Sequence, residues 1–367
     1  MKILHISDLH IGKRVHGFSM IEDQKYILNQ ILDIIDAKQI ELVMMAGDIY
    51  DQSIPCEQAV VLFDWFINEL VMRKVKSCII SGNHDSNIRL GFGAKVFERQ
   101  GVYIESGYHG KIENVKEGNV CIHMIPFVKP AMVQPFFKEQ KVDSYQKAME
   151  CLLSNVELEA GYIHIAMVHQ FIVGAKTCES EEVSVGGLDQ ISADLFKKFD
   201  YVALGHLHSF QHMGKNGWYC GTMLKYSVDE IQQQKRVIVL DVSDHIEMEE
   251  VCLHPLRDLV EIRGEYMELT NRMFYENLNK DDYYSIVLTD ENDVPNAFVK
   301  LQMIYPNIMK LAYDNQRTKE QQTLKKIDGI EEKNPLSLIG EFYKLQNNAE
   351  MNEKQKKIVE LLWEEIR

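Results

Sequence analysis

Residues 200–208 read DYVALGHLH, an apolar run that closes on a glycine and then carries two histidines, His206 and His208. Short apolar runs bounded by glycine and polar residues are typical of interior strands of a sheet. Side chains at i and i+2 of a strand point to the same face, so the two imidazoles can share one site. The stretch therefore predicts a buried strand that presents two metal-ligand side chains at its carboxyl end.

The same pattern occurs four more times in the chain. Each of these apolar runs stops at one or two of the following residues: Asp8, His10, Asp48, Asn83, His84 and His169. In open α/β sheets, ligands bind beyond the carboxyl ends of the strands. We therefore expect one metal crevice built from five strand ends that are far apart in the sequence.

The first part of the chain alternates between strand and helix patterns. Apolar residues recur at helical spacing in 21–40 and in 58–72, between the first three strand runs. Such alternation is typical of a parallel sheet with right-handed crossovers. A helix is expected at 142–155, the runs before His169 and His208 are expected to rejoin the sheet, and 236–242 and 246–253 are expected to close the core. The fold class is therefore α/β, with mixed sheets flanked by helices.

Composition divides the chain into four parts. Residues 1–255 contain all five strand ends and form the core. Residues 256–315 form a small α/β module, with a strand at 284–288 and a helix over 294–314 that is interrupted near Pro306. Nine of the nineteen residues in 316–334 are charged, which is typical of a solvated linker.

The last part, residues 335–367, reads as two short helices. Asn352 and Gln355 have the spacing of a capping box at the start of the second helix. Helices of this length are marginal alone, so their apolar faces need a partner protein. The residues expected to bind that partner are Leu338, Ile339, Phe342, Ile358 and Leu362.

Charge and cysteine content limit the possible classes of protein. The formal net charge of the 367 residues is -15, so a role on DNA would need metal ions and a basic partner. The seven cysteines are scattered without a CxxC pair, which argues against a disulfide framework and a cysteine zinc site. The first strand begins almost at Met1 and no apolar run reaches membrane length, so we expect a cytoplasmic protein without membrane contact.

The candidate ligands indicate the chemistry. They are two carboxylates, one amide and four imidazoles: Asp8, His10, Asp48, Asn83, His169, His206 and His208. Seven ligands exceed the four that one zinc ion takes, but they suit two ions that share a carboxylate. Asp48, alone at its strand end, is the natural bridge. Nitrogen and oxygen ligands suit manganese or iron as well as zinc.

Charge then indicates the substrate. Two divalent ions against two carboxylates leave an excess of about two positive charges, which favours a phosphate anion. The reaction class is phosphoester hydrolysis. His84, beside Asn83, is placed to protonate the leaving oxygen or stabilise the transition state. Asp51 and Asp85 are expected to support the site rather than bind metal.

Several other residues have less decided roles. Lys13 and Arg14 fit either a solvated loop or a phosphate contact. His5, His123 and His164 lie inside or before predicted strands and are interpreted as structural.

Taken together, DxH at Asp8, GDxxD at Asp48, GNHD at Asn83, the lone His169 and GHxH at His206 resemble the calcineurin-like metallophosphoesterase family. With YCGTMLKYSVDE at 219–230, the resemblance extends over the whole chain and includes the nucleases of double-strand-break repair within that family. It implies a four-layer metallophosphoesterase sandwich with a small capping domain and C-terminal helices.

The resemblance also implies roles for individual residues. The ligand sets are Asp8, His10, Asp48 and His208 for the first ion, and Asp48, Asn83, His169 and His206 for the second. Manganese is the implied ion and His84 the catalytic histidine. Lys13, Arg14 and Tyr226 are candidate DNA contacts.

The implied activity is double-strand exonuclease and single-strand or hairpin endonuclease action on DNA. The implied partner is a coiled-coil ATPase that binds the terminal helices, with the protein as a homodimer inside a heterotetramer. One rival is a phosphoesterase acting on cyclic nucleotides or small phosphate esters, which leaves the module, linker and terminal helices unexplained. A second rival is a catalytically silent scaffold, but that reading expects missing ligands and none is missing.

Overall fold

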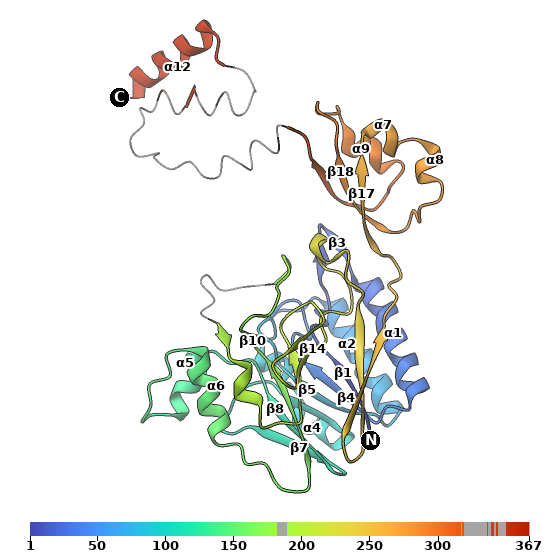
Figure 1. Cartoon of the computed structure of the whole chain (residues 1–367), viewed down its shortest axis with the longest axis vertical. Helices are drawn as coiled ribbons and strands as arrows, with labels where there is room; N and C mark the ends of the chain where they lie inside the picture. Colours follow the sequence, from blue (N-terminus) through green and yellow to red (C-terminus); the bar gives the residue numbers. More distant parts are fainter. Residues whose placement is uncertain are drawn as a thin grey trace. The chain divides into compact units, whose positions relative to one another are not determined.

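The computed structural model describes residues 1–181, 189–316 and 350–366, together with 318, 336, 339, 340 and 343. Two compact units make up the chain, Met1–Leu259 and Val260–Arg367. Figure 1 shows the helices and strands of both units.

The first sheet of the first unit has six strands in the order β16-β15-β1-β4-β5-β6. Its strands are β1 (Lys2–Ile6), β4 (Leu42–Ala46), β5 (Lys76–Ile80), β6 (Val102–Glu105), β15 (Arg236–Val242) and β16 (Ile246–Cys252). The strands β1, β4, β5 and β6 run parallel, and β15 and β16 are antiparallel. Helices α1 (Ile21–Lys38) and α2 (Glu57–Met72) connect the parallel strands, so the predicted crossover helices are confirmed.

The second sheet also has six strands, in the order β13-β14-β12-β9-β8-β7. Its strands are β7 (Glu113–Glu117), β8 (Val120–Ile125), β9 (Ile163–His169), β12 (Tyr201–Gly205), β13 (Gln211–Met213) and β14 (Gly217–Tyr219). The prediction that the runs before His169 and His208 rejoin the first sheet is wrong, because β9 and β12 pair with each other and with β8 and β14. A strand pattern shows that a segment is buried but does not show which neighbour it pairs with.

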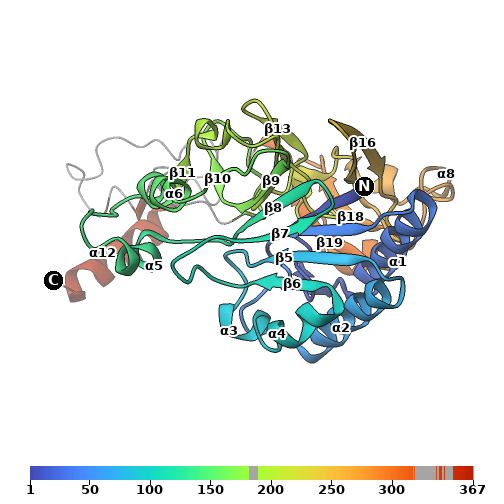
Figure 2. The ribbon, with the colours of Figure 1, turned by 90° about the horizontal axis from the view of Figure 1, so that it is seen from below.

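The two sheets pack face to face through one apolar core. Alternate residues of both sheets meet in it, among them Met44 and Ile238 of the first sheet and Ile122, Met167 and Ala203 of the second. Figure 2 shows α2 and α4 (Ala94–Phe97) on one side of β5 and β6, with β8 on the other side.

The outer face of the second sheet carries a further core. Ala166 and Val168 of β9 pack there with Met149 and Leu152 of α6 (Tyr145–Ser154). The layers are therefore helix, sheet, sheet and helix, and the predicted four-layer sandwich is confirmed.

Shorter elements complete the first unit. They are β2 (Arg14–Val15), β3 (Phe18–Ser19), α3 (Asn87–Leu90), α5 (Pro130–Val133), β10 (Phe171–Ile172) and β11 (Gln190–Ile191), with 3₁₀ turns at Glu98–Gln100, Gln134–Phe136, Ala193–Phe196 and Val228–Glu230.

The second unit contains a three-stranded sheet in the order β17-β18-β19 with its own apolar core. Its elements are β17 (Leu259–Gly264), α7 (Tyr266–Leu269), α8 (Arg272–Tyr275), β18 (Tyr283–Leu288), α9 (Ala297–Gln302) and β19 (Ile308–Tyr313). The helix expected over 294–314 is wrong in its second half, which is strand β19 paired parallel with β18. Helix α9 already ends at Gln302, four residues before Pro306. Leu311 and Tyr313, two residues apart, then pack on the same core, as alternate residues of a strand do.

The chain ends in helix α12 (Glu353–Ile366). Its predicted capping box is confirmed: Asn352 Oδ1 accepts from the backbone N of Gln355 at 3.0 Å, and Gln355 Oε1 accepts from Asn352 N at 2.9 Å. Of the expected partner-binding residues, Ile358 and Leu362 are more than half exposed and Ile339 is partly buried, whereas Leu338 and Phe342 lie outside the described residues.

In the part of the chain that the structure describes, no helix combines the length and apolar composition needed to cross a membrane.

Candidate metal centre

The carboxyl ends of β1, β4 and β5 from one sheet meet those of β9 and β12 from the other. Backbone hydrogen bonds join the loops that follow β1 and β4. Asp8 N donates to Gly47 O at 3.1 Å, and His10 N donates to Asp48 O at 2.9 Å. Asp8 Oδ1 accepts from His206 N at 2.9 Å and so links the two sheets directly. All five predicted strand ends therefore converge on one buried place.

The side chains at this place form two overlapping groups around Asp48, since ligand atoms of Asp8, Asp48 and His169 also lie within 4.8 Å of one another. In the first, His10 Nε2 lies 3.1 Å from His208 Nε2 and 3.7 Å from Asp48 Oδ2. Ligand atoms of Asp8, His10 and His208 all lie within 4.8 Å of one another. This group contains four of the seven candidate ligands.

The second group contains the other three candidate ligands and again Asp48. His169 Nε2 lies 3.3 Å from Asp48 Oδ2 and 3.1 Å from Asn83 Oδ1, and His206 Nδ1 lies 2.8 Å from Asn83 Oδ1. The carboxylate of Asp48 thus lies between the two groups, in the position of a bridge.

His84 lies at the rim of this centre. Its Nε2 is 4.0 Å from Asp48 Oδ2, and its side chain is 17% exposed whereas that of Asp48 is 2% exposed. Its Nδ1 donates to the Asp51 carbonyl at 2.8 Å, because a carbonyl can only accept. The ring is therefore fixed with Nε2 toward the centre.

The backbone at the centre is strained. Asp8, His10, Asp48 and His206 have φ angles of 51°, 43°, 49° and 110°, in the region that residues with a side chain rarely adopt. Each such residue costs about 1–3 kcal/mol and persists only where its surroundings fix it. These φ angles point the four side chains toward one another, and strained residues that cluster in this way are typical of a functional site.

Two motif glycines are required by close approach. Gly47 has φ of 91°, and a Cβ there would overlap the His169 ring. A Cβ at Gly82 would overlap the Asp48 carboxylate. The glycine of the GDxxD motif therefore lets the second sheet approach the first, and the glycine of the GNHD motif lets the loops after β4 and β5 approach each other.

The donor set fits divalent metal ions. Asp8 Oδ2 is buried and has no hydrogen-bond partner among the described residues. The facing Nε2 atoms of His10 and His208 would repel each other as two lone pairs, so they need a proton or a cation between them. Buried unpaired polar atoms of this kind are costly, and two ions would satisfy them together.

The electrostatics agree with this fit. Burial lowers the pKa of His10 to about 4 and that of His206 to about 3, which keeps both rings neutral as metal ligands must be. Burial disfavours the charged form of His169 too, but Asp48 outweighs it and raises the pKa of His169 to about 9. Burial also raises the pKa of Asp8 to about 6. The Asp48 carboxylate therefore stabilises a positive charge on His169, at the place that a metal ion would occupy.

Asp51 and Asp85 support the surrounding loops, as predicted. Asp85 accepts from the backbone N of Ile49 at 3.0 Å and of Gly82 at 2.9 Å, which joins the loops after β4 and β5. Asp51 accepts from Lys13 Nζ at 2.7 Å.

The candidate DNA contacts lie in different settings. Lys13 is engaged with Asp51, and Arg14 is exposed and donates to Gly17 O. Tyr226 is buried, and its hydroxyl donates to Leu9 O at 3.0 Å. Its ring centroid is 6.0 Å from that of His10, so it packs beside the centre.

A buried ion pair near His208 was not predicted from the sequence. Glu230 Oε2 accepts from Lys235 Nζ at 2.6 Å, and Glu230 Oε1 accepts from Ser180 Oγ at 2.7 Å. Ser180 Oγ is 2.6 Å from His208 Nδ1, so the network orients the ring that presents Nε2 to the centre. Burial disfavours the Glu230 carboxylate, but Lys235 outweighs it and holds the pKa of Glu230 well below its usual range.

Comparison with known proteins identifies the class first. Residues 1–210 match the family model of the calcineurin-like phosphoesterases, which covers every candidate ligand described above. Residues 255–347 match the model of the type 5 capsule protein repressor C-terminal domain. The first unit is thus the catalytic domain of a metal-dependent phosphoesterase.

A curated relative makes the assignment narrower. The SbcD subunit of the SbcCD nuclease of Staphylococcus epidermidis is 34% identical over 365 residues, which covers 97% of this chain and 96% of that protein. The chain therefore belongs to the SbcD family of nuclease subunits.

We expect Glu230→Gln to destabilise the protein by about 3–5 kcal/mol, because it leaves the Lys235 charge buried without its partner. The affinity for divalent metal ions should fall about 10- to 100-fold, because the support of His208 is weakened. Urea unfolding and calorimetric titration measure the two effects. The double variant Glu230→Gln, Lys235→Met should recover part of the stability; equal stability of the single variant and the wild type would contradict this account.

Proposed function

We propose that this protein is a manganese-dependent DNA nuclease that degrades double-stranded ends as an exonuclease and cuts single strands or hairpins as an endonuclease. We further propose that it works in the cytoplasm in a complex with an SbcC-type coiled-coil ATPase. The observation that carries the proposal is that Asp8, His10, the last residue of β9 and the two histidines that follow β12 meet around the Asp48 carboxylate. The name of the relative, one subunit of a nuclease called SbcCD, supports the substrate and the partner.

The ligand sets follow the two groups around Asp48. We assign Asp8, His10, Asp48 and His208 to one ion and Asp48, Asn83, His169 and His206 to the other. Nitrogen and oxygen donors without a thiolate suit Mn²⁺. When bound, two such metal ions supply Lewis acidity toward the phosphoryl oxygens and the attacking water.

The protein's own residues then position and transfer a proton. Asp85 and Asp51 fix the loops, and the Asp51 carbonyl fixes the His84 ring with Nε2 toward the centre. In its imidazolium form, Nε2 of His84 donates to a phosphoryl or leaving oxygen. The strained backbone of Asp8 and His206 keeps their side chains in place before substrate arrives.

Two substitutions separate metal binding from proton transfer. Asp48→Asn should abolish manganese-dependent cleavage, because it removes the bridge between the ions. His84→Ser should retain the manganese and lose about 10²- to 10⁴-fold in turnover, the usual contribution of a general acid. The assay uses blunt, hairpin and single-stranded DNA, with bound metal counted by elemental analysis. Full nuclease activity in both variants would refute the assigned centre.

For DNA contacts we retain Lys13 and Arg14, which lie at the start of the β2–β3 hairpin, close in sequence to His10. Tyr226 is omitted from the proposed contacts because it is buried.

The terminal helix is the proposed attachment for the ATPase. Ile358 and Leu362 of α12 are both more than half exposed and are four residues apart, so they lie on one helix face. An exposed apolar face on a short helix is typical of a binding segment. Leu338, Ile339 and Phe342 are proposed to contribute a second apolar stripe.

Removal of residues 335–367 should release the ATPase but leave hydrolysis of a small phosphodiester. The double variant Ile358→Asp, Leu362→Asp should weaken the complex similarly, because charges replace the apolar face. Lys356→Gln, roughly on the opposite face of α12, is the matched control. Pull-down of the ATPase measures all three; a complex that survives the truncation would show that the tail is not the attachment.

We propose that the protein forms a homodimer within the complex and that the outer side of its first sheet is the dimer interface. Val60 and Val61 of α2 and Ile88 of α3 are exposed, as is Phe92, although Phe63 and Phe66 of α2 are buried. Figure 2 shows α2, α3 and α4 on the same side of the sheet. Exposed apolar side chains on one side of a sheet are typical of a protein interface.

The double variant Val61→Glu, Phe92→Glu should therefore convert a dimer to a monomer in sedimentation velocity. Phe136→Glu, which alters an exposed aromatic on another element, is the control and should leave the mass unchanged. A wild-type protein that sediments as a monomer at high concentration, or a variant that stays dimeric, would rule out this surface.

A further inference from the structure

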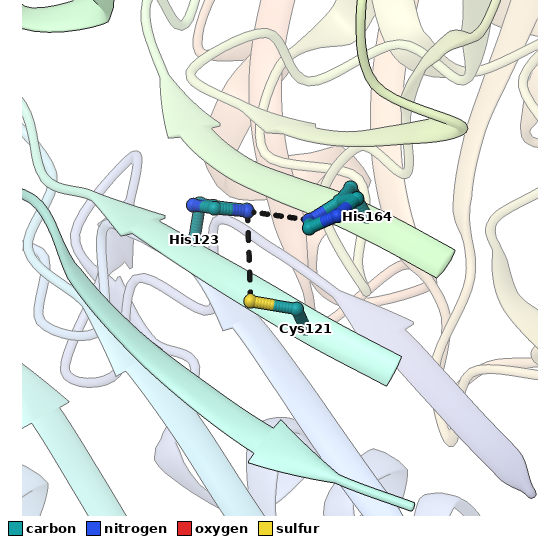
Figure 3. Close-up of side chains that lie close together, drawn as sticks. All are labelled: Cys121, His123 and His164. Atoms are coloured by element: carbon teal, nitrogen blue, oxygen red, sulfur yellow. Dashed lines mark hydrogen bonds between the residues drawn. The ribbon is translucent and has the colours of Figure 1, made fainter. Parts of the chain in front are cut away.

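A second group of metal-binding side chains lies on the second sheet, away from the metal centre. Cys121 and His123 are at i and i+2 of β8, and His164 of β9 pairs with Cys121 in the parallel register. Val120, Ile122 and Met124 of the same strand point into the core between the sheets. The three side chains therefore share the outer face of the sheet (Figure 3).

This group is distinct from the centre already described. His164 precedes His169 by five residues on β9, which at about 3.3 Å per residue separates them by roughly 16 Å. The odd spacing also puts the two side chains on opposite faces of the sheet. One ion cannot contact both places.

The three ligand atoms converge on one point. Cys121 Sγ lies 3.6 Å from His123 Nε2, and His123 Nε2 lies 2.9 Å from His164 Nδ1. All three atoms lie within 4.8 Å of one another, and each residue is at most 5% exposed. Zinc bonds of about 2.3 Å to sulfur and about 2.0–2.1 Å to nitrogen in a tetrahedron require an S···N separation of about 3.6 Å. The observed S···N distance already meets this requirement, and the two nitrogens must separate by a few tenths of an ångström.

The surroundings prepare His164 as a ligand. Its Nε2 is 2.9 Å from the Glu159 carbonyl, which only accepts, so Nε2 carries the proton and Nδ1 has a free lone pair. A carbonyl that receives the outer N–H of a histidine is a frequent second contact at metal sites. Burial, with His164, Lys198 and Lys116 nearby, lowers the pKa of His123 to about 4, so that ring is neutral.

We propose that Cys121, His123 and His164 bind one zinc ion, with water in the fourth position. Thiolate and imidazole together favour zinc over manganese, which is the reverse of the preference at the oxygen-rich centre. Binding releases the Cys121 thiol proton to solvent, and the His123 proton moves from Nε2 to Nδ1. The site joins β8 to β9, the strand whose far end carries His169.

Burial and a nearby charge have opposite effects on the pKa of the Cys121 thiol. Burial raises the pKa of the Cys121 thiol, and Lys116 lowers it. Lys116 is paired with Glu159, and Lys198 donates to the carbonyls of Leu153 and Val156. A bound cation would stabilise the thiolate, so zinc affinity should rise with pH as the thiol loses its proton.

The alternative is a hydrogen-bonded His123–His164 pair inside the sheet that binds no metal. Cobalt distinguishes the two, because thiolate-bound Co²⁺ has a charge-transfer absorption in the near ultraviolet that oxygen and nitrogen ligands do not give. The experiment titrates Co²⁺ into the full-length protein whose other centre has been saturated with Mn²⁺. The absorption should reach its maximum at one equivalent and disappear when Zn²⁺ is added.

Variants assign the absorption to this site. Cys121→Ala should abolish it, and His164→Ala should weaken cobalt binding at least tenfold. Cys151→Ala, at another buried cysteine, should retain it. Far-ultraviolet circular dichroism establishes that each variant is folded. A wild-type protein without the absorption, or Cys121→Ala with it, would overturn the proposal.

Discussion

The buried carboxylate of Asp48 lies where the two sheets meet, and the geometry of the metal centre follows from it. It follows β4 of the first sheet, yet it lies 3.3 Å from His169, which ends β9 of the second sheet. A buried carboxylate stays ionised only where positive charge or hydrogen-bond donors compensate its burial, and at Asp48 histidines face the carboxylate. At one edge the two sheets are therefore held together by the contact between Asp48 and His169. Elsewhere they pack through a shared apolar core.

The fold supports this arrangement at a local cost. Asp8, His10, Asp48 and His206 all have positive φ, and the apolar core between the sheets is what keeps such strained residues in place. Glycines at 47 and 82 make room where a Cβ would collide with His169 or Asp48. The residues that stabilise the fold and those that form the site are thus different: the strands pack in the apolar core, and the residues at their carboxyl ends form the candidate metal centre.

Much of the site could be read from the sequence because both of its signals are local. An apolar run that stops at a ligand residue requires only neighbouring positions, so the ends of β1, β4, β5, β9 and β12 were predictable. Pairing between distant segments was not, which is why β9 and β12 were expected in the first sheet. For the same reason the sequence did not predict β19, whose pairing with β18 prevails over a helical pattern. Glu230 and Lys235 are only five residues apart, but the sequence does not show that this pair lies beside His208. The sequence also does not show the grouping of Cys121 and His123 with His164, since their ligand spacing exists only across two strands.

If two ions share Asp48, anomalous scattering should detect both. A crystal soaked in manganese and measured at the manganese absorption edge should show two peaks about 3.5–4 Å apart, with Asp48 between them. The first peak should lie among Asp8, His10 and His208, and the second among Asn83, His169 and His206. A single peak, or two peaks that do not share Asp48, would contradict the account.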